Sequence, residues 1–199
     1  MGSLTTLYPA PASNNILEIL SGVADGRAVT VSSGTYTFQN VTAGHSMSTS
    51  YSDLPGSAIT YTPPEGAKYV LYKFSYKSNS ASLNYGSSGI HHTKLFIDGT
   101  DVYRAHKSVA GNYSGSHSNN HANFTSFTEY VFDLTATSDD LGQGKLNGWT
   151  TGKLIKCQGR DYSSPYYQAD IHKNDWEDGT GASGEEVYTK PTIKIIAYK

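Results

Sequence analysis

Side chains that alternate between apolar and polar with a period of two run through much of the chain and predict β-strands. The clearest example is the segment 70–77, in which one alternating set is aromatic or aliphatic throughout and the other contains two lysines and a serine. One face of this strand is therefore expected to be buried and the other to be wetter. The same reasoning predicts strands at residues 93–97, 130–134, 153–158 and 192–198.

Turn residues separate these strands. Asp98-Gly99 is a strong signal for a tight hairpin turn between Ile97 and Val102. Several strands joined by turns, with no convincing long helix between them, indicate an all-β fold that is a β-sandwich or a jelly roll. We assign residues 56–199 to this head domain.

The first 55 residues have a different pattern and are predicted to form an N-terminal anchoring arm. Ser13 is a candidate cap for a short helix, and the turn Ser32-Ser33-Gly34 lies between two short apolar runs that predict a small hairpin. A helix of two turns is not stable alone in water. Its apolar residues are therefore the predicted anchoring residues that hold a neighbouring molecule: Ile16, Leu17, Ile19 and Leu20.

The composition narrows the choice of partners. Only 37% of the 199 residues are hydrophobic, whereas aromatic residues reach 12% and include 16 tyrosines. This profile fits a β-sandwich with a tyrosine-rich surface. The formal net charge is −2 and the 15 basic residues form no long run, so we expect no binding to nucleic acid or to anionic membranes.

Cysteine and hydropathy patterns add three expectations. The single cysteine, Cys157, rules out an internal disulfide and lies in a predicted strand interior, where a free thiol packs like a small apolar group. No apolar run approaches the roughly 18 residues of a membrane span, and Met1 to Leu4 lack the features of a signal peptide. The chain is therefore expected to be made in a cytoplasm and to leave it only as part of a larger assembly.

The candidates for metal binding and catalysis are weak. His117 and His121 have a plausible ligand spacing, but neither a cysteine pair nor an H-E-x-x-H helix accompanies them, although a trimer could bring copies of one histidine together. The acidic stretch 175–186 departs from a calcium loop at its central position. The acid pairs Asp139-Asp140 and Glu185-Glu186 should point apart rather than face each other across a cleft. We predict no catalytic residue, no metal site and no cofactor.

One segment has the composition of an adaptable binding loop. Residues 110–123 are rich in serine, asparagine, glycine, tyrosine and histidine, as in antibody loops, although an inert or assembly-facing loop is the alternative. The predicted recognition residues are Tyr113, His117, Asn119, Asn120 and His121. Trp149 precedes a strand, and a packing role at the sandwich edge explains it without a ligand.

Seven short phrases carry a family resemblance: 14–22 (NNILEILSG), 61–66 (YTPPEG), 94–99 (KLFIDG), 148–156 (GWTTGKLIK), 158–162 (QGRDY), 175–179 (DWEDG) and 191–197 (PTIKIIA). Together they resemble a family of virion structural proteins from tailed phages of marine bacteria and cyanobacteria. The resemblance covers nearly the whole chain and is weakest between residues 105 and 124. It implies a jelly-roll head like those of tumour necrosis factor and C1q, usually displayed on the particle as a trimer, and such analogy at the level of fold does not define a site.

This resemblance implies a non-enzymatic virion surface protein that binds other virion proteins as a homotrimer. In one version the arm clamps onto the capsid and the head is a decoration or cement element. In an alternative version the chain joins a tail or fibre, and the head binds a glycan of the host surface. A third hypothesis, from another class, is a free carbohydrate-binding module whose exposed tyrosines stack on sugars.

Overall fold

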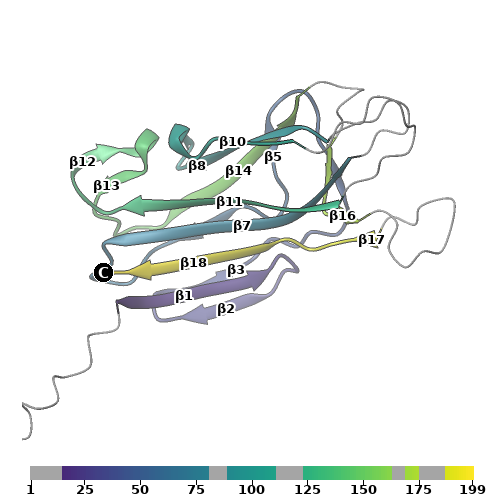
Figure 1. The fold of residues 1–199 in the computed structure, drawn as a ribbon. Coiled ribbons are helices and arrows are strands. Elements are labelled where there is room, and N and C mark those ends of the chain that lie inside the picture. The colour runs from purple at the N-terminus through teal and green to yellow at the C-terminus, as the bar shows by residue number, and fades with distance from the viewer. Residues whose placement is uncertain (1–14, 81–88, 111–122, 163–168, 175–186) are drawn as a thin grey trace, which may run out of the picture.

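The computed structural model describes residues 15–80, 89–110, 123–162, 169–174 and 187–199, and these form a sandwich of two β-sheets (Figure 1). The first sheet has the strand order β1 (Ile16–Val23), β18 (Thr192–Tyr198), β7 (Tyr69–Ser80), β11 (Asn123–Asp133), β13 (Lys145–Asn147) and β12 (Thr135–Asp140). Two short strands extend it beside the far part of β7: β15 (Ala169–Ile171) and β4 (His45–Ser46).

The second sheet has the order β10 (Lys107–Val109), β8 (His91–Ile97), β14 (Lys153–Asp161) and β5 (Ser52–Asp53). Strand β6 (Ile59–Tyr61) also pairs with β14, and β9 (Thr100–Asp101) pairs with β8. Two small hairpins complete the fold: β2 (Ala28–Val31) with β3 (Gly34–Thr37), and β16 (Lys173–Asn174) with β17 (Val187–Tyr188). The helical turns η2 (Tyr103–Ala105) and η3 (Leu141–Gln143) are short. Within the described ranges, no helix has the length and apolar character that a membrane crossing would require.

The connectivity is that of a jelly roll. The main strands in chain order are β1, β6, β7, β8, β10, β11, β14 and β18, and the first sheet uses them in the order first, eighth, third, sixth. The second sheet uses them in the order second, seventh, fourth, fifth. Two interleaved Greek keys of this kind define a jelly roll. The predicted all-β jelly-roll fold is therefore confirmed.

Period-two alternation produces the core, as predicted from the sequence. On β7 the side chains of Val70, Tyr72 and Phe74 are fully buried, whereas those between them are only partly buried. Cys157 on β14 is a free, fully buried thiol, and burial raises its pKa to about 12. The predicted structural role of this cysteine is therefore confirmed.

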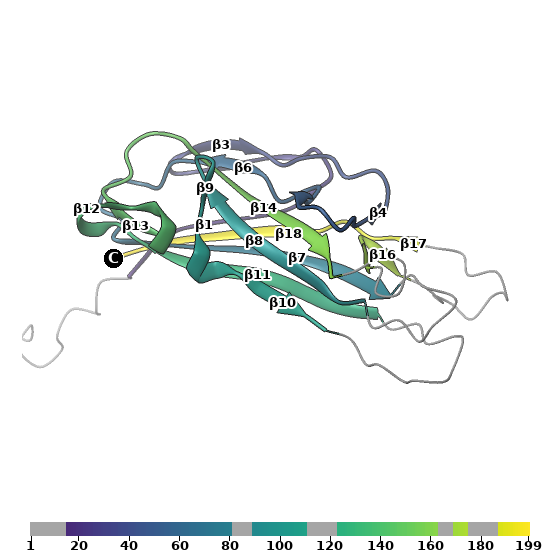
Figure 2. The same cartoon turned by 90° about the horizontal axis from the view of Figure 1, so that it is seen from above.

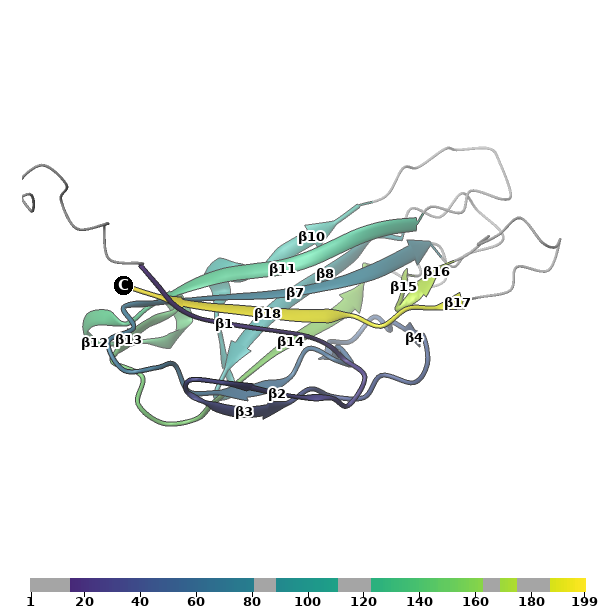
Figure 3. The same ribbon diagram turned by 90° about the horizontal axis from the view of Figure 1, so that it is seen from below.

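Both predicted hairpins are present. Strands β2 and β3 pair through the Ser32-Ser33-Gly34 turn, and Figure 3 shows this hairpin beside the first sheet. At the other turn Asp98 has φ 47° and Gly99 has φ 80°. Two consecutive positive φ angles are typical of a type I′ turn, which asparagine or aspartate followed by glycine adopts at the least cost.

The predicted N-terminal helix is wrong. Residues Ile16–Val23 form strand β1, which pairs antiparallel with β18 and places Leu20 opposite Ile195 in the core. The open edge of β18 offers a row of backbone partners that a two-turn helix cannot replace, so tertiary pairing overrides the local pattern. Phe38 and Leu54 are buried in the same core, so the described residues before position 55 belong to the sandwich rather than to a separate arm.

Candidate functional site

The four predicted anchoring residues lie on β1, and strand pairing divides them between its two faces. Leu20 is fully buried in the core and Leu17 is half-buried where the register shifts. Ile16 and Ile19 keep 44% and 48% of their side chains exposed. Only these two of the four predicted anchoring residues are therefore exposed on the surface.

Strand register extends the exposed surface at Ile19 across four strands. Ile19 lies opposite Ile196, Ile196 lies opposite Leu71, and Leu71 lies opposite Val131. The next position along each strand points inward, as fully buried Leu20 shows on β1, so these four residues share the outer face of the first sheet. We call them the apolar row. Val131 is 41% exposed at one end and Ile19 is exposed at the other.

The surroundings of the apolar row give it defined limits. On one side Tyr198 lies between Ile16 and Tyr69, and the two tyrosine rings stack with centroids 5.4 Å apart. On the other side the next residues along the strands are charged or polar, and Lys73 Nζ lies 2.9 Å from a carboxylate oxygen of Glu129. A continuous apolar surface with a polar rim is typical of a protein interface.

Leu71, Val131 and Ile196 are the functional candidates that our sequence reasoning missed. Each occupies a position that the alternation assigns to the wetter face. A run of three or more consecutive apolar residues, as in Tyr130-Val131-Phe132, could have indicated them. A strand with one face in solvent does not need apolar residues on both faces, so such a run indicates that the outer face is apolar too.

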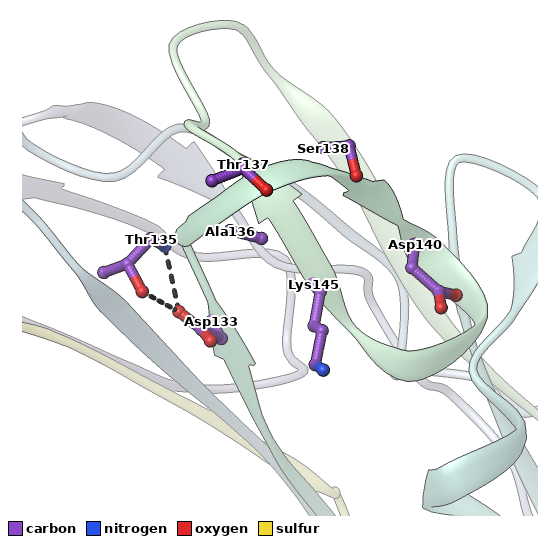
Figure 4. A pocket seen from close by; sticks show the side chains of 7 residues that line it. All are labelled: Asp133, Thr135, Ala136, Thr137, Ser138, Asp140 and Lys145. Atoms are coloured by element: carbon purple, nitrogen blue, oxygen red, sulfur yellow. Dashed lines mark hydrogen bonds between the residues drawn. The ribbon is translucent and has the colours of Figure 1, made fainter.

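Figure 4 shows a polar hollow beside β12, at the end of the molecule that also carries the C terminus in Figure 2. Its volume is about 380 Å³, and it is lined by Asp133, Thr135, Ala136, Thr137, Ser138, Asp140 and Lys145. Its carboxylates stabilise local turns. Asp133 accepts hydrogen bonds from the amide and hydroxyl of Thr135 at 2.9 and 2.7 Å, and Asp140 accepts from Gln143 at 3.2 and 2.7 Å.

These bonds fix what the hollow can do chemically. Hydrogen bonds from Thr135 hold the pKa of Asp133 below its usual range, which is the opposite of what a general acid needs. Asp139 accepts from the Asn147 amide at 2.7 Å while its neighbour Asp140 bonds to Gln143, so this acid pair points apart as predicted. Glu185 and Glu186, the other acid pair, lie outside the described residues.

Trp149 packs at the sandwich edge. Its ring is only 4% exposed, its Nε1 donates to the backbone oxygen of Tyr61 at 3.1 Å, and it meets the rings of Tyr61 and Phe132 edge-on. One side of it contributes to a hollow of about 300 Å³ lined by Pro63, Pro64, Glu65, Gly66, Ala67, Gly148 and Thr150. Because most of the indole is in the core, the predicted packing role is confirmed.

Four of the five described histidines, His91, His92, His106 and His172, have a hydrogen-bond partner within the chain. His106 Nε2 lies 2.7 Å from an Asp101 carboxylate oxygen, and His92 Nδ1 lies 2.8 Å from the Ser108 hydroxyl. His91 and His172 are fully buried. In the part of the chain that the structure describes, no three histidine, cysteine, aspartate or glutamate residues are grouped to hold a metal ion.

Two sequence-based candidates cannot be placed. The predicted recognition residues Tyr113, His117, Asn119, Asn120 and His121 lie outside the described residues. The same holds for the acidic stretch 175–186.

Comparison with known proteins gives little further information. No protein-family model and no curated protein matches the chain. Among solved structures, one of the infectious bursal disease virus Gx strain matches with a TM-score of 0.32 at 9% identity, over 92% of this chain and 37% of that chain. One of the Gt strain matches with a TM-score of 0.26 at 12% identity, over 88% of this chain and 44% of that chain. The chain spans less than half of either, and at such TM-scores the likeness bears on neither function nor assembly.

Proposed function

We propose that this chain is a non-enzymatic virion surface protein of a tailed phage, a jelly-roll head that decorates or cements the capsid as a homotrimer. The apolar row carries this proposal: Ile19, Leu71, Val131 and Ile196 cross the outer face of the first sheet on four adjacent strands. A protein that decorates or cements a capsid has to bind a neighbouring subunit. Removing an exposed apolar surface of this kind from water favours such binding.

The apolar row and the sequence resemblance support the proposal independently. The resemblance rests on short phrases throughout the chain, whereas the row follows from strand register. The chain has one cysteine and it is buried, so intersubunit disulfides are not the expected source of rigidity, and noncovalent association takes that role. In a closed ring of three copies, each apolar row would contact a different patch of the next copy.

Two other functions remain as alternatives. A tail or fibre location, with the head binding a host-surface glycan, uses the same assembly but a different anchor. A free carbohydrate-binding module would work as a monomer and would gain nothing from the apolar row. The location of the chain on particles and its oligomeric state distinguish these functions.

Localisation provides the first test. Immunogold labelling or cryo-electron microscopy of particles made from the genome that encodes the chain should place it on the shell. Density on a tail or fibre would favour the receptor-binding alternative. Absence of the chain from purified particles would overturn the virion proposal.

The second test changes the apolar row. The double substitution Ile19→Glu and Val131→Glu should leave the fold intact, because both side chains are already partly exposed. In an interface the two carboxylates would be buried without partners, at a cost of roughly 3 kcal/mol or more per subunit, which is over a hundredfold in affinity. Light scattering should show a trimer for the unchanged chain and a monomer for the variant.

A matched control places two carboxylates on the same sheet face outside the apolar row. Thr125 and Thr192 are both exposed there, and Thr125→Glu with Thr192→Glu adds the same charge. This control should remain trimeric and bind to particles normally. A monomeric unchanged chain, together with normal particle binding by the Ile19 and Val131 variant, would contradict the role of the row.

A further inference from the structure

The outer face of the second sheet differs from that of the first, because it combines cations with exposed aromatic rings. Tyr51, which precedes β5, is 37% exposed and has two cations over its ring. Lys94 Nζ lies 4.8 Å from the ring centroid, and the Arg160 guanidinium carbon lies 5.4 Å from it. Lys94 and Arg160 come from neighbouring strands, β8 and β14, so the tyrosine joins them at the surface.

A second aromatic pair continues this face. Arg160 lies opposite His92 on β8, and the His92 ring lies 6.1 Å from that of Tyr162, which is 54% exposed. We call Tyr51, His92, Lys94, Arg160 and Tyr162 the basic-aromatic face. It belongs to the sheet opposite the one that carries the apolar row.

The charges on this face are incompletely balanced. Lys94 forms an ion pair with Asp101 at 2.9 Å, and the nearby Lys156 pairs with Asp53 at 2.8 Å. Arg160 instead donates to the backbone oxygen of Asp161 at 3.3 Å, and among the described residues no carboxylate pairs with it. A guanidinium without a carboxylate partner, held over an aromatic ring, retains donors for a planar anion.

The chemistry of these groups favours one class of ligand. Guanidinium and carboxylate match in a two-bond geometry, and tyrosine rings offer flat apolar surfaces against which the C–H faces of a sugar can lie. The face is a small cationic spot on a chain whose net charge is −2, so it does not suit a long polyanion bound by charge alone. A sugar chain that carries carboxylates can bind both the guanidinium, through its carboxylates, and the tyrosine rings, through its C–H faces.

We propose that the basic-aromatic face binds an acidic polysaccharide, with the Arg160 guanidinium contacting a uronic-acid carboxylate and Tyr51 and Tyr162 contacting sugar rings. This site uses none of the residues of the predicted recognition loop 110–123, and it does not depend on trimer formation. On a virion surface it would provide attachment to an acidic host glycan.

The experiment measures binding of hexagalacturonate by isothermal titration calorimetry, with a neutral dextran oligomer, dextran sulfate and oligo-dT as comparison ligands. The unchanged chain should bind hexagalacturonate at least tenfold more tightly than each of the three. Arg160→Gln should weaken this binding at least tenfold. Tyr51→Leu, which keeps every charge, should weaken it at least fivefold.

Arg104 provides a matched control because it is an exposed arginine that also lies against a tyrosine, 5.2 Å from the ring of Tyr103, outside the basic-aromatic face. Arg104→Gln should change the affinity less than twofold, and thermal melts should show that all variants are folded. The Ile19→Glu and Val131→Glu variant should bind the sugar normally, which separates this site from the proposed assembly. Lack of hexagalacturonate binding, equal binding of dextran sulfate or oligo-dT, or equal effects of the Arg104 and Arg160 substitutions would overturn the proposal.

Discussion

Replacing Glu18 with alanine is expected to lower the free energy of unfolding by about 3 to 5 kcal/mol. Glu18 is only 6% exposed, and its side chain points between the sheets from β1. Its carboxylate accepts four hydrogen bonds: from the Ser32 hydroxyl at 2.6 Å, the Ser33 amide and hydroxyl at 2.8 and 2.7 Å, and the Tyr61 hydroxyl at 2.9 Å. Alanine removes these charge-assisted bonds and leaves a buried tyrosine hydroxyl without its acceptor.

Urea denaturation of the purified chain at pH 7 measures this loss. Glu18→Gln should cost less, because it keeps the volume of the side chain and one acceptor oxygen. It should still cost some stability, because its NH2 group would face hydroxyl and amide donors. Ser21→Ala, at an exposed position of the same strand, should change stability by less than about 0.5 kcal/mol. A loss below about 1 kcal/mol for Glu18→Ala would show that the carboxylate does not join β1 to the hairpin.

The pH dependence of the Glu18 contribution has a defined sign. Burial raises the pKa of this carboxyl, but hydrogen bonds from Ser32, Ser33 and Tyr61 outweigh it and hold the pKa below its ordinary value of 4.5. The unfolded chain therefore binds the proton first, and the stabilisation is lost as the pH falls below about 4.5. Glu18→Gln should remove this part of the acid sensitivity.

Acidification from pH 6.5 to 4 is expected to destabilise the fold by several kcal/mol, chiefly through His91 and His172. Both side chains are fully buried, and burial lowers the pKa of each to about 4. The unfolded chain takes up protons near pH 6.5 and the folded chain does not, so stability falls through this window by up to roughly 3 kcal/mol per histidine.

Asp161 opposes this effect. It is fully buried on β14, and burial, with a smaller contribution from the charge of Asp170, raises its pKa to about 6. The folded chain therefore binds this proton before the unfolded chain does, and stability rises by roughly 3 kcal/mol as the pH falls from 6 to 4. The expected net result is a loss, because two histidines outweigh one carboxyl.

Two variants test this balance by urea denaturation at several pH values. His172 has φ 61°, a left-handed conformation that asparagine tolerates, so His172→Asn should fold and flatten the acid loss. Asp161→Asn removes the opposing carboxyl and should steepen the loss. An unchanged profile in both variants would show that other groups control the acid sensitivity.

Local alternation of apolar and polar residues was enough to predict most of the long strands. Features that depend on contacts between distant segments could not be predicted in this way. The alternation in residues 70–77 was sufficient to identify β7 and its buried face, because each strand carries its own period. Residues 16–20 are apolar at four of five positions and fit a helix or a strand equally well, so only pairing with β18 decided between them.

The candidate site was likewise predicted only where it depends on local sequence. The sequence predicted four anchoring residues on a helix, and only one of them, Ile19, belongs to the apolar row. Leu71, Val131 and Ile196 join Ile19 only through strand register. The basic-aromatic face likewise combines Tyr51 with residues more than forty positions later in the chain, Lys94 and Arg160. Such pairings depend on topology, which the alternation of a single strand does not encode.

Glu18 also has a consequence for how β1 finds its place. Ile16, Leu17, Ile19 and Leu20 surround it, so a slip of β1 by one residue against β18 would still bury apolar side chains. The slip would, however, turn the carboxylate to the outer face and separate it from Ser32, Ser33 and Tyr61. Strand β1 also lies at one end of the strand order of the first sheet. An inward-pointing charge on such an end strand opposes pairing with a strand from another molecule. One acidic residue thus selects a single alignment for a strand whose apolar residues would accept two.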